Sequence, residues 1–169
     1  SPKPPSFLLD GKTALVSGGS RGIGLGCSMA LAEAGADVLI VARSEDQVKD
    51  AASQIRAAGY KARGIALDVT YQTGVCNIFK AHGPFDVLVN SAGIARHGSP
   101  IDTTPEDFDA VMNVNVRAAF FLAQEAARGM QSLGGGSIIQ ISSQMGHVGG
   151  QDRAVYCGSK HAIEGFNKA

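Results

Sequence analysis

Tyr156 and Lys160 stand four residues apart in AVYCGSKHAIEGF, a stretch with helical character. Residues at this spacing share one face of a helix, so the phenol and the ammonium group point at one volume. A free phenol ionises near about pH 10 and exchanges protons poorly at neutrality unless a nearby cation favours its anion. Lys160 would supply that cation. The pair suits acid/base chemistry on a substrate oxygen, although such pairs also occur by chance on helix surfaces.

Ser142 and Ser143 come at the end of SIIQIS (137–142), an apolar run that predicts a strand. Open parallel sheets bind their ligands at the carboxyl ends of the strands. A hydroxyl at this place could therefore hydrogen-bond a substrate oxygen. Either serine taken alone could equally be a turn residue.

A glycine-rich turn lies between a predicted strand at 12–17 and a predicted helix at 23–34. Glycines let the backbone approach a pyrophosphate and let the helix pack closely on the strand, while the helix N-terminus favours negative charge. A turn of this kind can also exist without a ligand, but its place after a strand and before a helix favours dinucleotide binding. The residues expected to contact the cofactor are Gly18, Ser20, Arg21, Gly22, Ile23 and Gly24.

The second predicted strand, 38–42, ends in Ala42-Arg43-Ser44, where a site specific for NAD would offer a carboxylate to the ribose hydroxyl. Arg43 instead suits a 2′-phosphate, and Arg21 adds a second cation at the same end of the sheet. Both arginines could also be ordinary solvated side chains. The pattern favours NADP over NAD.

Strands and helices alternate along the chain, which predicts a Rossmann-type, doubly wound parallel α/β sheet with helices on both faces. Ser44 and Gly59 are expected to begin and end the second helix, and 107–131 reads as one long helix. We expect one domain over 1–169 with a loose leader at 1–9, and the strand order 3-2-1-4-5. The five strands are expected at 12–17, 38–42, 61–67, 86–90 and 137–142.

Composition favours small-molecule partners: 15 basic residues balance 15 acidic ones, so nothing indicates nucleic-acid binding. No apolar stretch is long enough for a membrane span, and three scattered cysteines favour a reducing, cytoplasmic setting. The four histidines lack metal-ligand spacing, so no metal site is expected. His97 and His147 could nevertheless line a substrate pocket.

The chemical motifs, taken in order and at these separations, resemble the short-chain dehydrogenase/reductase family. They are Gly18-x-x-x-Gly22-x-Gly24, Asn90-Ser91-Ala92-Gly93, Asn115, Ser143 and Tyr156-x-x-x-Lys160. The resemblance implies that Tyr156 is the general acid/base, that Lys160 supports it and holds the nicotinamide ribose, and that Ser143 orients the carbonyl. It also implies that Asn115, rather than the nearby Asn113, positions a water beside the lysine.

The same resemblance extends the expected cofactor site. Asp68-Val69 matches the family's adenine-contacting pair, and Asn90, Ala92 and Gly93 match a segment in which Ser91 replaces the usual second asparagine. The implied activity is hydride transfer between NADP(H) and a carbonyl or alcohol, as in carbonyl and 3-oxoacyl reductases, with a homodimer or homotetramer as the full-length assembly. Family members continue with further C-terminal strands and a lid, so a truncated chain, a non-catalytic nucleotide-binding fragment and an interaction module are alternatives. The motifs do not select a substrate.

Overall fold

A five-stranded parallel sheet in the order β3-β2-β1-β4-β5 forms the centre of the molecule, as the alternating sequence pattern predicts. The computed structural model describes residues 6–169. Leu15 of β1 lies opposite Leu39 of β2 and Leu88 of β4, and all three side chains are buried. The strands are β1 (Thr13–Ser17), β2 (Asp37–Ala42), β3 (Ala62–Ala66), β4 (Val87–Asn90) and β5 (Ser137–Gln140).

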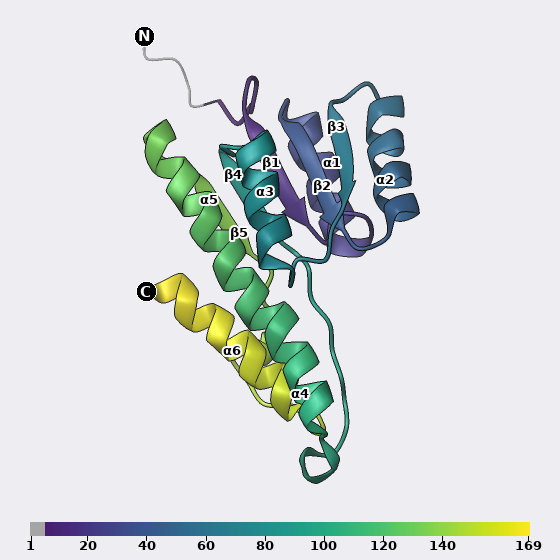
Figure 1. The fold of residues 1–169 in the computed structure, drawn as a ribbon, viewed down its shortest axis with the longest axis vertical. Coiled ribbons are helices and arrows are strands. Elements are labelled where there is room, and N and C mark those ends of the chain that lie inside the picture. The colour runs from purple at the N-terminus through teal and green to yellow at the C-terminus, as the bar shows by residue number, and fades with distance from the viewer. Residues whose placement is uncertain (1–5) are drawn as a thin grey trace.

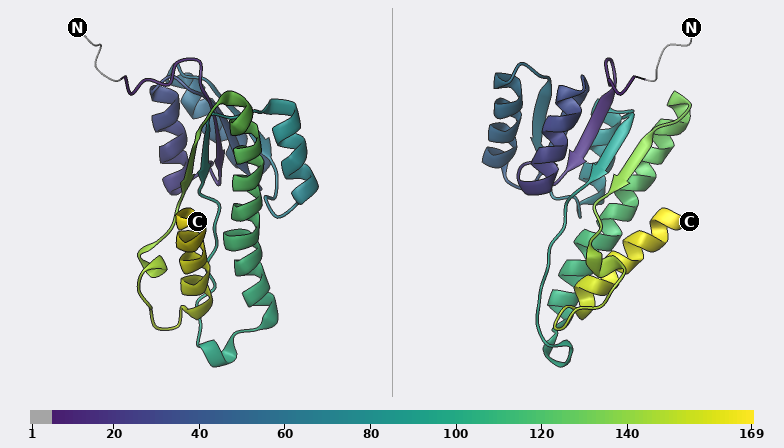
Figure 2. Two further views of the ribbon diagram at one scale, coloured as in Figure 1. Left: turned by 90° about the vertical axis from the view of Figure 1, so that its left-hand side faces the viewer. Right: turned by 180° about the vertical axis from the view of Figure 1, so that it is seen from behind.

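Helices cover both faces of this sheet, which confirms the doubly wound arrangement (Figures 1 and 2). The α-helices are α1 (Gly22–Glu33), α2 (Glu45–Ala57), α3 (Gln72–His82), α4 (Pro105–Met112), α5 (Ala119–Leu133) and α6 (Ala154–Lys168). Short turns of other helix types are η1 (Pro100–Asp102), η2 (Asn113–Ala118) and η3 (Gln144–Gly146).

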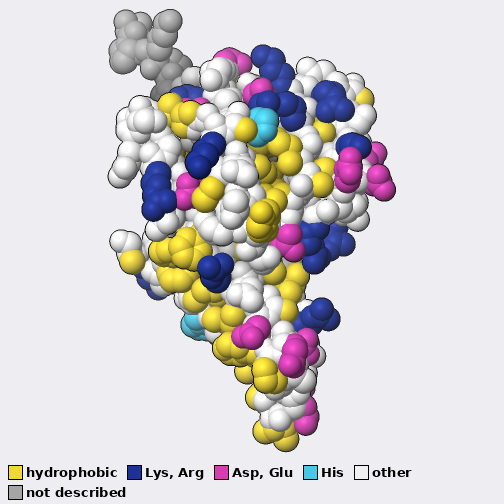
Figure 3. Space-filling view, in the orientation of Figure 1, with side chains coloured by type: hydrophobic (Ala, Val, Ile, Leu, Met, Phe, Trp, Pro, Cys, Tyr) yellow, Lys and Arg dark blue, Asp and Glu magenta, His cyan; other side chains and the backbone are white. Residues whose placement is uncertain are grey.

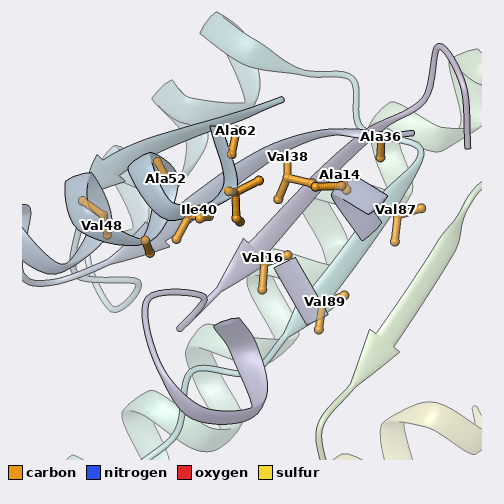
Figure 4. Close-up of a cluster of buried hydrophobic side chains, with 13 residues drawn as sticks. Ala14, Val16, Ala36, Val38, Ile40, Val48, Ala52, Ala62, Val87 and Val89 are labelled. Atoms are coloured by element: carbon orange, nitrogen blue, oxygen red, sulfur yellow. The ribbon is translucent and has the colours of Figure 1, made fainter. Parts of the chain in front are cut away.

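The alternation of side chains along each strand divides the core into two layers. Ala14 and Val16 of β1 pack in the cluster that contains residues of α1 and α2, and Figure 4 shows them with their neighbours on β2 and β4. Leu15, between them, belongs to the opposite cluster with residues of α3 and α5. β1 is apolar on both faces because both faces are covered.

Local capping signals set the limits of α2 as predicted. The Ser44 side chain accepts a hydrogen bond from the backbone N–H of Gln47 at the start of the helix. Just past its end, Gly59 adopts φ +92°, a conformation that favours glycine.

The long helix predicted over 107–131 is present as a continuous helical path, but it is not α-helical throughout. The helical path runs through α4, η2 and α5, and the six residues of η2 form a π-helix rather than an α-helix. Such segments insert an extra residue into the helical turn and often mark functional sites. The hydrophobic period does not distinguish this local widening from a regular helix.

The predicted leader at 1–9 falls partly outside the described residues, which begin at Ser6. Phe7 is exposed, whereas Leu9 packs against the core and donates a backbone hydrogen bond of 2.6 Å to Ala34. The ordered domain therefore includes the last residue of the predicted leader. Among residues 6–169 no helix is long and apolar enough to cross a membrane, and no cluster of His, Cys, Asp or Glu could hold a metal ion.

Candidate functional site

A cleft of about 940 Å³ opens at the carboxyl edge of the sheet, toward which the strand arrows run in Figure 1. Segments that follow all five strands contribute to it, and α6 adds Tyr156 and Lys160. This is the edge at which open α/β sheets bind ligands. Twelve of the expected site residues line it: Gly18, Ser20, Arg21, Gly22, Ile23, Arg43, Asp68, Val69, Ala92, Gly93, Tyr156 and Lys160.

Gly18 and Gly24 are required by close packing at the turn between β1 and α1. Gly18 has φ +66°, and a Cβ placed on it would lie 2.7 Å from the backbone nitrogen of Ala92. A Cβ on Gly24 would collide with the carbonyl of Gly18. Gly24 therefore lies behind the cleft wall, where it brings α1 against the turn.

The N-terminus of α1 carries no side-chain cap. Arg21 occupies the capping position without a capping hydrogen bond, and the first turn contains no acidic residue. By contrast, Ser44 caps α2 and Thr104 caps α4. The first N–H groups of α1 thus stay available to an anion, as at many phosphate-binding helix ends.

Arg43 and Asp68 form a pair of opposite charges where β2 and β3 end. Partial burial acts to raise the pKa of Asp68, but hydrogen bonds from the backbone and hydroxyl of Thr70 and the charge of Arg43 outweigh it, so the pKa is lowered. The bonds from Thr70 measure 2.9 and 2.7 Å. Asp68 is thereby held as a carboxylate, and Arg43 remains exposed to meet an incoming anion.

Lys160 is the most deeply placed cation of the cleft. Only 7% of its surface is exposed, and its Nζ donates a hydrogen bond of 2.7 Å to the carbonyl of Ile141. Nζ lies 5.8 Å from the centre of the Tyr156 ring. Burial lowers the pKa of this lysine because a charged group is costly in a poorly solvated place.

Asn115 is buried beside the same group and organises the segment that follows β4. Its Oδ1 accepts a hydrogen bond from the Ile94 N–H, and its Nδ2 donates to the Ile94 carbonyl, both at 2.8 Å. Nδ2 also donates to Ser159 on α6. Asn113, the alternative candidate, is exposed. A Cβ on Gly93 would lie 3.4 Å from Asn115 Oδ1 and 3.9 Å from Lys160 Nζ, so Asn115 and Lys160 flank Gly93.

The two serines after β5 have different surroundings. Ser142 lines the cleft, and its buried hydroxyl meets no hydrogen-bond partner of good geometry among the described residues. The hydroxyl still faces the Glu164 carboxylate. The pKa of Glu164 is lowered first by this interaction with Ser142 and then by the charges of His147 and Lys168. Ser143 lies outside the cleft lining, where its hydroxyl accepts a hydrogen bond of 3.1 Å from Met145 N and begins η3.

Asn90 also lies behind the cleft lining, at the buried end of β4. Its amide accepts a hydrogen bond from the Ser17 hydroxyl and donates one to the carbonyl of Ala119. These bonds join β1, β4 and α5 just below the carboxyl edge of the sheet. In this structure Asn90 supports the site from within.

Ser142, considered together with Ser143, and Ser91, inside the Asn90–Gly93 motif, also line the cleft. Eight further lining residues were not expected: Ala42, Ser44, Gln47, Leu67, Ile94, Ala95, Val114 and Ile141. Several of them directly adjoin an expected residue at the end of a strand. Their place next to a predicted strand end is the sequence feature that could have identified them as lining residues. Gln47 and Val114 come from helical segments. Their positions depend on tertiary packing.

Comparisons with known proteins agree with this geometry. The family model for short chain dehydrogenases matches residues 12–169. The gluconate 5-dehydrogenase of Gluconobacter oxydans (strain 621H) is 38% identical over 169 residues, covering 98% of this chain and 66% of the relative. Versicolorin reductase 1 of Aspergillus parasiticus is 42% identical over 164 residues, covering 94% of this chain and 62% of the relative.

A solved structure shares the fold. The gluconate 5-dehydrogenase from Burkholderia cenocepacia J2315, in complex with NADP and tartrate, has a TM-score of 0.90 at 37% identity and covers 96% of this chain. This chain covers 66% of that one. Across these three proteins it spans 62% to 66% of the relative's length.

Proposed function

The chain belongs to the short-chain dehydrogenase family, and from this premise we propose that it carries the cofactor site and acid/base site of an NADP(H)-dependent carbonyl reductase or alcohol dehydrogenase. One observation carries the proposal. A single cleft joins the glycine turn, Arg43 and the Tyr156–Lys160 pair. A nucleotide held at one end would thus face a proton donor at the other.

The residues of the cleft suit a dinucleotide. Gly18 and Gly22 line the cleft without side chains, so the backbone there is free to approach a pyrophosphate, and the uncapped start of α1 offers N–H donors. Arg21 and Arg43 would meet a 2′-phosphate with charge-assisted hydrogen bonds. The NADP in the related B. cenocepacia structure supports the preference for NADP over NAD.

Each side chain has a separate role in the proposed reaction, in which one hydride and one proton are added to the carbonyl. When bound, the reduced nicotinamide supplies a hydride to the carbonyl carbon. Tyr156 donates its phenolic proton to the carbonyl oxygen, and in alcohol oxidation the phenolate takes that proton back. Lys160 supports the phenolate with its nearby charge. Ser143 lies outside the cleft lining and accepts a hydrogen bond from Met145 N, so to orient the substrate oxygen its hydroxyl would donate its own proton toward the cleft. Asn115 holds the Ile94 segment against this group.

Self-association belongs to the same proposal. Figure 3 shows hydrophobic side chains gathered over α5 and α6 in the lower half of the molecule. Phe120 of α5 is 40% exposed, Phe166 of α6 is 39% exposed, and their rings pack 5.1 Å apart. Exposed aromatic clusters of this kind often mark contacts between chains. A second copy is the expected partner.

A parallel titration with NADPH and NADH, followed by protein or cofactor fluorescence, tests the cofactor half of the proposal. Tight NADPH binding with weak NADH binding is expected. Consumption of NADPH on addition of a ketone then tests the chemical half. Absence of binding by both cofactors would contradict the assignment for this chain.

A further inference from the structure

His97 packs against Tyr156, although none of the motifs includes it. The two ring centroids lie 5.7 Å apart and the ring planes meet at 87°, an edge-to-face contact. Tyr156, Ile94 and Ala95 line the cleft, whereas His97 itself does not. The imidazole therefore stands at the border of the cleft, next to the proposed proton donor.

The segment that carries His97 is held on both sides. Three residues before it, the backbone of Ile94 is bound at both its N–H and its carbonyl by Asn115. One residue after it, Gly98 donates a backbone hydrogen bond of 2.9 Å to Asp152, in the turn that leads into α6. The backbone on both sides of His97 is thus held relative to the helix that carries Tyr156, and the edge-to-face contact places the imidazole against the Tyr156 ring. A side chain fixed in this way can select between ligands, because little ordering remains to be done on binding.

The ring nitrogens of His97 have no hydrogen-bond or ion-pair partner among residues 6–169, and the side chain is exposed. Two other histidines near α6 are engaged. His147 faces the Glu164 carboxylate at 3.3 Å, and His161 Nδ1 lies 2.9 Å from the carbonyl oxygen of Cys157. An imidazole can both donate and accept hydrogen bonds, so His97 can meet either a hydroxyl or a carboxylate.

We propose that His97 recognises a hydroxyl or carboxylate on the carbon next to the reacting carbonyl. This inference rests on the proposed function, because Tyr156 must lie within hydrogen-bond reach of the reacting oxygen. His97 packs directly beside the Tyr156 ring, so it meets the neighbouring part of the same substrate. The substrate class is then ketones that carry an adjacent polar group, in preference to purely hydrocarbon ketones.

Hydroxyacetone and butan-2-one are suitable probes because they differ at one position only. The carbon next to the carbonyl carries a hydroxyl in hydroxyacetone and a methyl group in butan-2-one. His97→Phe keeps an aromatic ring against Tyr156 and removes both nitrogens. For this variant the KM for hydroxyacetone should rise about 3- to 10-fold, as expected for one lost hydrogen bond, with little change in kcat and no change for butan-2-one. His161→Phe is the matched control and should behave as wild type. Equal changes for both ketones, or none for either, would overturn the proposal.

A second measurement does not depend on turnover. The histidine ring protons of the whole chain can be followed by NMR with NADP⁺ present, and the resonance missing from His97→Phe identifies His97. This resonance should shift with hydroxyacetone and stay in place with butan-2-one. A shift with both or with neither refutes the inference. Failure of the wild-type chain to oxidise NADPH with either ketone would instead count against the proposed function.

Discussion

Lys160 places its ammonium nitrogen 5.8 Å from the centre of the Tyr156 ring while donating a hydrogen bond of 2.7 Å to the carbonyl of Ile141. The contact with Ile141 ties α6 to the segment that follows β5. It also holds a cation in a place with little solvent, and this burial lowers the pKa of the lysine. The position that serves the proposed chemistry is therefore unfavourable for the charged lysine.

Lys160→Met should reveal this cost in the pH dependence of stability. The folded-state pKa of Lys160 lies below its ordinary value of 10.5, so between these two values the unfolded chain binds more protons than the folded one. The free energy of unfolding of the wild type should consequently rise relative to that of Lys160→Met as the pH increases through this window. Urea unfolding of both proteins at several pH values measures the difference.

Lys49→Met is the control for that measurement. The pKa of Lys49 is raised, first by its hydrogen bond with Glu45. Any contribution of this pair to the free energy of unfolding is therefore present below pH 10.5 and is lost as the pH rises through the raised value. Lys49 and Glu45 are well exposed, so solvent screens the pair and the effect should be small. A wild-type stability that falls relative to Lys160→Met with rising pH would contradict the account of Lys160.

Tyr156→Phe should remove carbonyl reduction and spare cofactor binding. The substitution deletes the proton donor and keeps the ring that packs against His97. The rate should fall by at least about 100-fold, the usual contribution of a general acid, while the Kd for NADPH stays nearly constant. Tyr60→Phe, in the turn between α2 and β3, serves as the control. Turnover at the wild-type rate in Tyr156→Phe would remove Tyr156 from the mechanism.

Arg43→Ala should weaken NADPH binding by about 1–3 kcal/mol, the loss expected for a charge-assisted contact with the 2′-phosphate. NADH lacks this phosphate, so its affinity should hardly change. Arg63→Ala is the matched control, because Arg63 pairs with Asp37 at 3.5 Å and does not line the cleft. Fluorescence titration gives all the affinities. A similar loss for both cofactors would show that Arg43 does not bind the 2′-phosphate.

Gly18→Ala should destabilise the fold by about 2–4 kcal/mol, because the new methyl group meets Ala92 and the residue has a positive φ. Gly26→Ala provides the contrast. Gly26 lies within α1 with open space around its Cβ position, so alanine there should stabilise the helix by about 0.5–1 kcal/mol. Thermal or urea unfolding compares the two. Equal effects would show that the packing between the turn and Ala92 is unimportant.

Local patterns predicted most of this fold because they arise from neighbours in the chain. The apolar runs located the strands, and the spacing of Tyr156 and Lys160 put both on one helix face of the cleft. The buried position of Asn90 and the π-helical turn η2 depend on partners far along the chain, such as Ala119 for Asn90. The contact between His97 and Tyr156 likewise joins residues from distant segments, so no local motif predicts it.

Asn115→Ala should destabilise the protein by about 1–3 kcal/mol, since it leaves the N–H and carbonyl of Ile94 without their partners in a partly buried place. The same change frees the segment that carries His97. The edge-to-face contact with Tyr156 should therefore loosen, and the NMR resonance of His97 should move toward the position of a histidine with no aromatic ring beside it. Asn113→Ala removes a nearby exposed amide and should alter stability by less than about 0.5 kcal/mol. Equal stability losses in the two variants would mean that the asparagine contacts do not hold this segment, and the cleft would then need another anchor for Ile94.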